Sequence, residues 1–301
     1  MSTTLRVGGR SIEISKPDKV LFPADGITKG DLIAYYRRIA ERLLPYLRGR
    51  PLVLRRYPEG IDGEGFFQKE APEWFPDWIP RVTVAKEGGV VHHVVCEEEA
   101  MLVFLAAQSC IEPHPWLATT DDLAHPDRMV FDLDPSEDSR LDDLRDTARA
   151  IRGLLLDLGL TPFLMTSGSR GYHVVIPLAR RQTFDEVRAL AHDVARLVAA
   201  QDPTRRTVEL AKARRGGRVF IDYLRNAYAQ TAIAPYAVRA RPGAPVAMPI
   251  GWDRLARVEP RTYRLGTAAR HAAETLDPWA GMADTAASLE DAQRILDGLL
   301  Q

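Results

Sequence analysis

The chain is poor in the features that mark secreted and membrane proteins. Its 301 residues include two cysteines, Cys96 and Cys110, and no apolar run approaches the roughly 20 residues that a membrane-spanning helix needs. Two cysteines in a chain of this length, without a cationic and apolar leader, favour reduced thiols over a disulfide framework. The sequence therefore excludes a disulfide-rich secreted domain and predicts a cytoplasmic protein without a membrane partner.

The chain also has almost no net charge, and it lacks internal repeats and low-complexity segments. Forty Lys and Arg residues balance 41 Asp and Glu residues, which leaves a formal charge of −1. No global positive field then attracts nucleic acid, so any such binding requires a local basic patch. A hydrophobic fraction of 46% excludes a disordered or fibrous chain and suffices for one large domain or two closely packed ones.

Apolar periodicity predicts interleaved helices and strands. Helical spacing indicates three helices: one after the capping residue Thr28 through Leu43, one over 141–158 before Gly159, and one over 184–197. Strand-like runs occupy 52–56, 90–96, 129–134, 163–166, 172–177 and 219–223. This alternation favours an α/β or α+β architecture.

Two aspartates stand two residues apart at the end of the apolar run 128–134. In a strand, Asp132 and Asp134 leave the same face, and two like charges held so close repel unless a cation lies between them. Pro135 ends the strand, and Asp222 ends another short apolar strand. A solvated strand end is the alternative for the pair alone, but three convergent aspartates predict a divalent-metal site.

The segment 166–173 places small and hydrogen-bonding residues between two predicted strands. Small residues let backbone N–H groups approach an anion, while Ser167, Ser169, Arg170 and His173 add side-chain donors, so the segment is a candidate phosphate cradle. The alternative is a hairpin whose glycines only satisfy turn geometry. A Walker loop is absent, which disfavours a P-loop nucleotidase.

Four arginines lie near the third aspartate or follow it: Arg215, Arg218, Arg225 and Arg239. Guanidinium groups hold phosphate oxygens in bidentate geometry, although such a group of arginines can equally form a solvated face. Arg225 and Arg239 stand in apolar or turn-like segments, where an unpaired charge is costly. Together with the aspartates, they indicate phosphoryl or nucleotidyl transfer.

These motifs closely resemble the polymerase domain of bacterial DNA ligase D, a member of the archaeo-eukaryotic primase superfamily. The resemblance rests on seven motifs in order, at 19–23, 65–69, 112–116, 131–135, 166–174, 220–223 and 234–243. It implies an α/β (α+β) fold, a primase-like catalytic core with mixed and antiparallel sheets flanked by helices. It further implies one primase-polymerase domain over 1–301, with 5′-phosphate and base-stacking elements in 1–110 and the metal aspartates in 111–301.

The resemblance also implies roles for the residues of the catalytic portion. Asp132, Asp134 and Asp222 would hold two divalent ions, Mn²⁺ or Mg²⁺, for two-metal nucleotidyl transfer. The triphosphate would lie against Ser167, His173, Arg225 and Arg239. Arg170 is a departure, because many relatives have lysine there, and it keeps the charge while changing the hydrogen-bond geometry.

Four further residues gain roles from the resemblance. Phe66 would stack on the incoming base, His114 would lie near its sugar, and Lys19 and Lys29 would bind a DNA 5′-phosphate. Each has an ordinary alternative: a core phenylalanine, since adjacent aromatic residues usually send one ring inward, a packed loop histidine, and surface lysines.

The implied function is template-directed addition of nucleotides, preferentially ribonucleotides, to a primer 3′-hydroxyl in gap filling or end processing during non-homologous end joining. The implied partners are gapped or broken double-stranded DNA with a 5′-phosphate, nucleoside triphosphates, Ku and a DNA ligase, with the protein a monomer that joins the bacterial nucleoid during repair. No ligase lysine motif or nuclease segment is evident, so an isolated ligase domain and a stand-alone paralogue remain open. Two other classes are a catalytically idle DNA-end-binding module and a metal-dependent phosphoesterase.

Overall fold

The computed structural model describes residues 2–300, which divide into two units of dense internal contact. Unit 1 comprises the chain through Asp121 together with Ile233–Met248 and Arg261–Asp277. Unit 2 comprises Asp122–Ala232, Pro249–Pro260 and the chain from Pro278 onward. These units are discontinuous in sequence, and the expected division of one domain at residue 110 stays a prediction.

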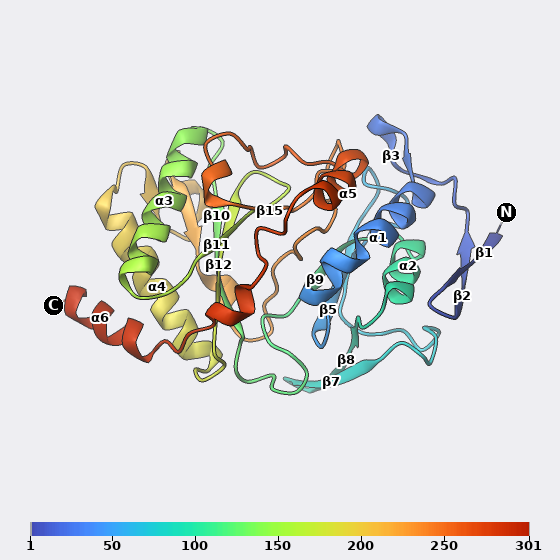
Figure 1. The fold of residues 1–301 in the computed structure, drawn as a ribbon, viewed down its shortest axis with the longest axis horizontal. Helices are drawn as coiled ribbons and strands as arrows, with labels where there is room; N and C mark the ends of the chain where they lie inside the picture. Colours follow the sequence, from blue (N-terminus) through green and yellow to red (C-terminus); the bar gives the residue numbers. More distant parts are fainter. Residues whose placement is uncertain (1, 301) are drawn as a thin grey trace. The chain divides into compact units, whose positions relative to one another are not determined.

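Unit 2 is built on a six-stranded sheet with the order β13-β14-β10-β12-β11-β15. All neighbours are antiparallel except β13 and β14. The strands are β10 (Arg128–Asp134), β11 (Phe163–Thr166), β12 (Tyr172–Pro177), β13 (Arg206–Thr207), β14 (Val219–Asp222) and β15 (Pro249–Ile250). Helices α3 (Leu141–Asp157) and α4 (Phe184–Gln201) lie side by side on one face of this sheet, and α6 (Glu290–Leu300) contacts α4 (Figure 1).

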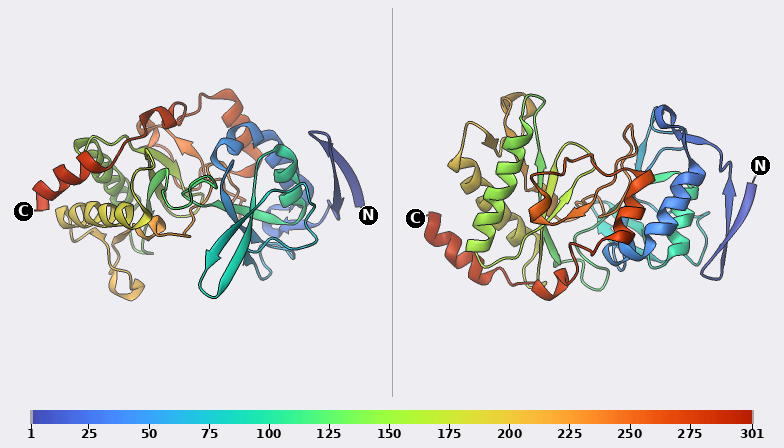
Figure 2. Two further views of the ribbon diagram at one scale, coloured as in Figure 1. Left: turned by 90° about the horizontal axis from the view of Figure 1, so that it is seen from below. Right: turned by 45° about the horizontal axis from the view of Figure 1, so that its top comes forward.

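Unit 1 contains a second sheet, with the order β6-β5-β8-β7 and with β9 also paired to β5. Its strands are β5 (Pro51–Arg56), β6 (Phe66–Gln68), β7 (Arg81–Lys86), β8 (Gly89–Val95) and β9 (Cys110–Pro115). Its helices are α1 (Lys29–Leu43), α2 (Glu99–Ala107) and α5 (Leu265–Glu274). Two hairpins complete it: β1 (Ser2–Val7) with β2 (Arg10–Ser15), which lies beside α2 (Figure 2), and β3 (Val20–Phe22) with β4 (Ile27–Thr28).

The structure confirms the helices and strands that periodicity predicts, to within a few residues at their ends. Thr28 caps α1 in a capping box with Asp31, and Gly159 follows α3 in the left-handed conformation at φ +75°. The predicted mixture of antiparallel and mixed sheets flanked by helices is also confirmed. No helix within residues 2–300 has the length and apolarity to cross a bilayer.

Candidate active site

Two neighbouring strands of unit 2 bring three carboxylates together. In the antiparallel pairing of β10 with β14, Asp132 lies directly opposite Asp222, and Asp134 lies two residues further along β10. Phe131 and Leu133 are fully buried, so the alternation predicted for this strand is confirmed. The three aspartate side chains therefore occur on one face of the sheet, along the short stretch where β10 and β14 pair.

An arginine and a histidine of the same unit lie against these carboxylates. Arg225 Nε is 3.4 Å from a carboxylate oxygen of Asp132 and 3.4 Å from one of Asp222. His173 Nε2 is 3.3 Å from Asp132 Oδ1. The Arg225 guanidinium thereby offsets the like-charge repulsion between Asp132 and Asp222.

Asp134 has its own pair of arginines. Arg170 Nη2 lies 3.2 Å from Asp134 Oδ1, and Arg215 Nη1 lies 3.5 Å from Asp134 Oδ2. The Arg215 guanidinium also stacks on Phe220, 3.7 Å from the ring centroid. Arg170, the departure from the family lysine, thus contacts a predicted metal ligand with its exposed side chain.

The donor set suits a hard divalent cation, since carboxylate oxygens are the ligands that Mg²⁺ and Mn²⁺ prefer. Among residues 2–300, however, no group of three His, Cys, Asp or Glu side chains is already arranged to hold a metal ion. Burial raises the pKa of Asp222, Arg225 counteracts this, and the Asp132 charge raises the pKa further. Such an environment favours any added cation that relieves the carboxylate repulsion.

The segment 166–173 forms a hairpin, in which Thr166 of β11 pairs with Tyr172 of β12. Within its loop the Ser167 hydroxyl accepts the backbone N–H groups of Ser169 at 3.2 Å and Gly171 at 3.1 Å. A Cβ at Gly171 would lie 1.7 Å from the Leu133 carbonyl oxygen, so glycine is required for the loop to approach β10. The turn geometry is confirmed, and phosphate binding by Ser167, Arg170 and His173 stays a prediction.

His173 is the buried member of this hairpin. Its side chain is 5% exposed, and its Nδ1 atom has no hydrogen-bond partner among the described residues. A buried ring nitrogen without a partner is unfavourable, so the site retains one unsatisfied polar atom beside the aspartates.

Asn226 is a residue of this site that the motifs do not reveal. Its side chain is fully buried and makes hydrogen bonds to both the backbone N–H and the C=O of Val130, each 2.8 Å long. It also donates to the Tyr223 carbonyl at 2.9 Å. Asn226 therefore fastens the turn that carries Arg225 to strand β10.

A second polar cluster lies in unit 1 and centres on Glu112. This carboxylate is 0% exposed and accepts from Arg239 Nε at 3.1 Å, from His114 Nε2 at 3.0 Å and from the Ala240 N–H at 2.8 Å. Arg55 Nη1 lies 3.3 Å away. Burial alone raises the pKa of Glu112, but the His114 hydrogen bond and the neighbouring charges hold this pKa well below its usual range.

The structure thus places His114 and Arg239 on one buried carboxylate. Sequence reasoning assigns no role to Glu112 or Arg55, although a signal exists: both are charged residues within apolar strands, and they are partners across the β5–β9 ladder. His114 is not a packed loop residue, because it belongs to strand β9 and its ring contacts the Glu112 carboxylate.

Phe66 and Phe67 of β6 are both exposed, at 43% and 57%. The alternative, in which one of the two rings turns into the core, is therefore excluded, and base stacking by Phe66 stays a prediction. Arg56 lies over the Phe66 ring at 5.6 Å and Arg55 over the Phe67 ring at 5.1 Å. Phe67 makes an edge contact with His114 at 5.8 Å, so Phe67 is the phenylalanine beside the Glu112 cluster.

Lys19 and Lys29 belong to a local basic group in unit 1. Lys19 Nζ pairs with the exposed Glu59 at 2.8 Å, whereas Lys29 is 6% exposed and donates to the Ser15 carbonyl at 2.9 Å. Burial lowers the Lys29 pKa, and the charges of Lys19, Lys16 and Arg56 lower it further. Lys29 is thus no ordinary surface lysine.

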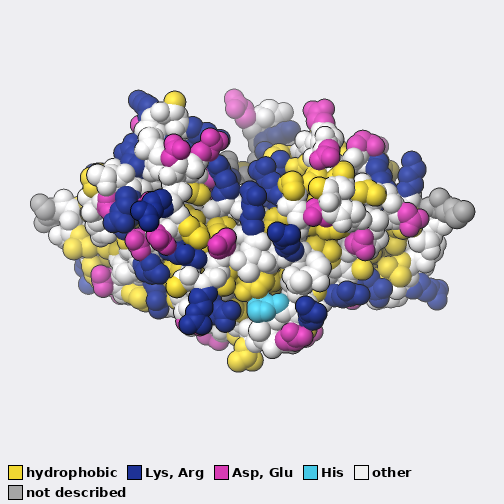
Figure 3. Space-filling view, turned by 90° about the horizontal axis from the view of Figure 1, so that it is seen from above, with side chains coloured by type: hydrophobic (Ala, Val, Ile, Leu, Met, Phe, Trp, Pro, Cys, Tyr) yellow, Lys and Arg dark blue, Asp and Glu magenta, His cyan; other side chains and the backbone are white. Residues whose placement is uncertain are grey.

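On the face of the molecule in Figure 3, Lys and Arg side chains gather in separate groups among acidic side chains.

Comparisons with known proteins identify the family of the chain. Residues 28–279 match the family model described as "LigD, primase-polymerase domain". The chain is 35% identical to the multifunctional non-homologous end joining protein LigD of Mycolicibacterium smegmatis over 84% of this chain and 34% of that protein. It is 34% identical to the Pseudomonas aeruginosa protein of the same name over 96% of this chain and 35% of that protein. The chain therefore spans about a third of the length of these curated relatives.

A solved structure matches the fold. The polymerase domain from Mycobacterium tuberculosis ligase D in complex with DNA aligns with a TM-score of 0.85 at 32% sequence identity, over 93% of this chain and 99% of that chain. The resemblance and the fold class predicted from the motifs are thus confirmed.

Proposed function

The chain belongs to the LigD primase-polymerase domain family, and on this premise we propose that it is a template-directed nucleotidyltransferase of non-homologous end joining. It adds nucleotides, ribonucleotides by preference, to a primer 3′-hydroxyl as gaps are filled or broken ends are processed. The observation that carries the proposal is the placement of Asp132 directly opposite Asp222, with Asp134 on the same strand face.

We propose that Asp132, Asp134 and Asp222 hold two divalent ions, Mn²⁺ or Mg²⁺. Such ions would supply Lewis acidity, which would lower the pKa of the primer hydroxyl and offset charge on the triphosphate. The arginines that now neutralise the carboxylates then become available for phosphate oxygens. Arg170 and Arg225 have side chains 46% and 41% exposed, which allows such an exchange of partners.

His173 and Ser167 complete the proposed triphosphate contacts of unit 2. The buried Nδ1 of His173 lacks a partner among the described residues, and a phosphate oxygen or a water molecule would satisfy it. Ser167 holds the loop closed through its two backbone contacts, so its contribution includes loop shape as well as any direct contact.

In unit 1, we propose that Phe66 and Phe67 offer aromatic surface for base stacking and that His114 contacts the sugar. Glu112 fixes the orientation of the His114 ring and of Arg239. One neutral hydrogen bond to a 2′-hydroxyl is worth roughly 0.5 to 1.5 kcal/mol, so this contact accounts for about 2-fold to 13-fold ribonucleotide preference.

The proposed DNA partner is gapped or broken duplex with a 5′-phosphate, which Lys19 and Lys29 bind. The related Mycobacterium tuberculosis domain was solved in complex with DNA, which supports DNA binding here. We further propose that residues 1–301 act as one monomeric primase-polymerase domain that works with Ku and a DNA ligase.

Product analysis tests the proposal against its alternatives. The protein is incubated with a primer-template, labelled nucleoside triphosphates and Mn²⁺. We expect a lengthened primer and released pyrophosphate. Release of inorganic phosphate without extension would instead identify a metal-dependent phosphoesterase, and DNA binding without either product would identify an idle end-binding module.

A further inference from the structure

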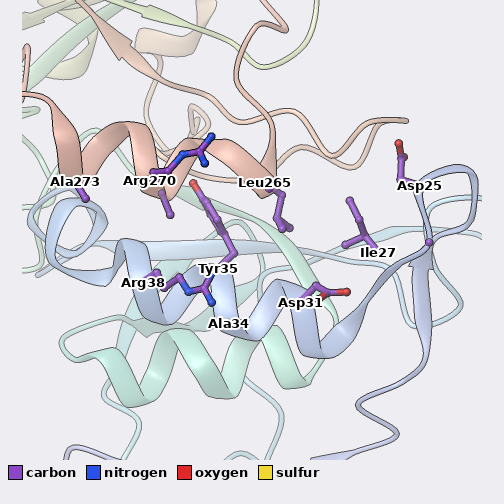
Figure 4. Close-up of a pocket in the computed structure, with 12 residues that line it drawn as sticks. Asp25, Ile27, Asp31, Ala34, Tyr35, Arg38, Leu265, Arg270 and Ala273 are labelled. Carbon is purple, nitrogen blue, oxygen red and sulfur yellow. The ribbon is translucent and has the colours of Figure 1, made fainter.

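A groove of about 680 Å³ lies within unit 1, between the start of α1 and the helix α5. Ala34 of α1 and Leu265 and Ala273 of α5 line it with apolar side chains (Figure 4), and Ala269 of α5 also belongs to its lining. None of its lining residues is assigned to nucleotide or DNA binding above. Its volume falls in the usual range for ligand sites.

The charges that line the groove are separated along its length. Asp25 and Asp31 lie at the end where α1 begins, while Arg38 and Arg270 lie toward the other end (Figure 4). Arg38 is seven residues beyond Asp31 on the same helix, which corresponds to about 10 Å along the axis. Two turns of a bound helix would cover this distance.

The two aspartates of the groove have hydrogen-bond partners within the protein, whereas the side chains of the two arginines have none among the described residues. Asp31 accepts from the Thr28 backbone in the α1 capping box, and Asp25 accepts from the Gly243 N–H at 2.6 Å. The side chains of Arg38 and Arg270 are exposed, and neither makes an ion pair or a hydrogen bond within residues 2–300. The groove therefore offers two uncompensated positive charges beside an apolar surface.

We propose that this groove binds an acidic amphipathic helical segment of a partner protein. Its apolar side chains would lie between α1 and α5, where the alanines permit close approach, and its carboxylates would pair with Arg38 and Arg270. Asp25 and Asp31 repel negative charge at one end of the groove, so a nucleic acid, with a phosphate at every position, suits it poorly, whereas a helix can confine its carboxylates to the end with Arg38 and Arg270. The proposal is independent of the polymerase function proposed above.

Selection from a peptide library tests this docking site. A random 12-residue library displayed on phage is panned on the wild-type protein and counter-selected on the double variant Arg38→Glu, Arg270→Glu. We expect enriched peptides with net negative charge and leucine-like residues at helical spacing. Failure to enrich any peptide, or enrichment of basic peptides, would overturn the proposal.

Variants then locate the bound peptide. The enriched sequence is synthesised with a fluorophore, and its affinity is measured by anisotropy. We expect a loss of about 10-fold or more in the double variant, because like charges then face each other. Ala273→Trp, which fills the groove without a change in charge, should weaken binding similarly.

Arg6→Glu is the matched control, because Arg6 is also exposed, has no ion pair among the described residues and does not line the groove. It should bind the peptide within about 2-fold of wild type, and all variants should retain wild-type circular dichroism and primer extension. Equal affinity in every variant would refute the site. Displacement of the peptide by a 12-nucleotide single strand, with weaker binding of that strand to the double variant, would reassign the groove to nucleic acid.

Discussion

Replacement of Glu112 by glutamine should destabilise the protein strongly, because this fully buried carboxylate is the shared acceptor of Arg239, His114 and Arg55. Glutamine keeps the shape of the side chain but removes its charge, and its NH₂ group would face the N–H donors of Arg239, His114 and Ala240 in place of an acceptor oxygen. Loss of one partner from a buried ion pair costs about 3 to 5 kcal/mol, and we expect a decrease of this size in the free energy of unfolding at pH 7.

Denaturant unfolding measures this change, with Glu70→Gln as the control. Glu70 is a strand-side carboxylate with a histidine partner, His92, but it is 54% exposed, so its loss should change the unfolding free energy by no more than about 0.5 kcal/mol. Glu112→Gln should also raise the KM for the nucleotide, because Arg239 and His114 lose their anchor. A Glu112→Gln protein as stable as Glu70→Gln would refute this assignment.

The pH dependence of stability provides a second test of the role of Glu112. The folded-state pKa of Glu112 is depressed, so its contribution is complete above the unfolded pKa of about 4.3 and is lost as pH falls toward the folded value. The difference in stability between wild type and Glu112→Gln should therefore shrink as pH falls from about 5 to 3. A difference that stays constant over this range would contradict the depressed pKa.

Three other predictions concern the hairpin loop, a buried histidine and the basic group. Gly171→Ala should reduce stability and primer extension, since its Cβ would clash with the Leu133 carbonyl oxygen. Gly153→Ala in α3 is the control, because a Cβ there meets no atom and the change should be neutral or stabilising. Equal melting temperatures of the two variants would contradict the clash. Burial lowers the His93 pKa, so the unfolded state binds more protons and the free energy of unfolding should rise with pH up to about 6.5. His93→Phe should lose this rise with pH. The same rise in the variant would argue against a contribution from His93. The Lys19→Ala, Lys29→Ala variant should lose preference for gapped DNA with a 5′-phosphate over a 5′-hydroxyl, by about 10-fold to 150-fold in affinity, and full retention would place the phosphate elsewhere.

Local patterns in the sequence predict the long elements of the fold well. The periodicity of α1, α3 and α4 and the apolar runs of β10, β11 and β12 are properties of neighbouring residues, and the structure places them within a few residues of the prediction. The order of the sheet is not such a property. The parallel pairing of β13 with β14 and the place of the two-residue β15 depend on contacts between distant segments, and these short strands have no periodic signal.

The candidate site divides in the same way. Asp132 and Asp134 are predictable because a period of two puts them on one strand face, and Asp222 because it ends a similar strand. Glu112 and Arg239 are 127 positions apart, and their pairing depends on a tertiary contact that no spacing predicts. The buried Asn226 likewise acts through Val130, 96 positions away. Sequence motifs therefore identify functional residues that lie on one strand or helix, whereas residues that connect distant segments are identified only in the structure.

The most direct test of the central claim is single-turnover extension of a primer on gapped DNA with Mn²⁺, by wild type and by Asp134→Ala, alongside DNA affinity and unfolding without metal. We expect extension to be abolished in the variant while DNA affinity changes little, because the carboxylate acts mainly in the transition state. The metal-free unfolding midpoint should fall little, since Asp134 is partly exposed, Arg170 is an exposed partner, and the buried Arg215 keeps its bonds to the Glu209 and Leu210 carbonyls. Near-normal extension by Asp134→Ala would show that the aspartates of β10 and β14 are not the catalytic centre.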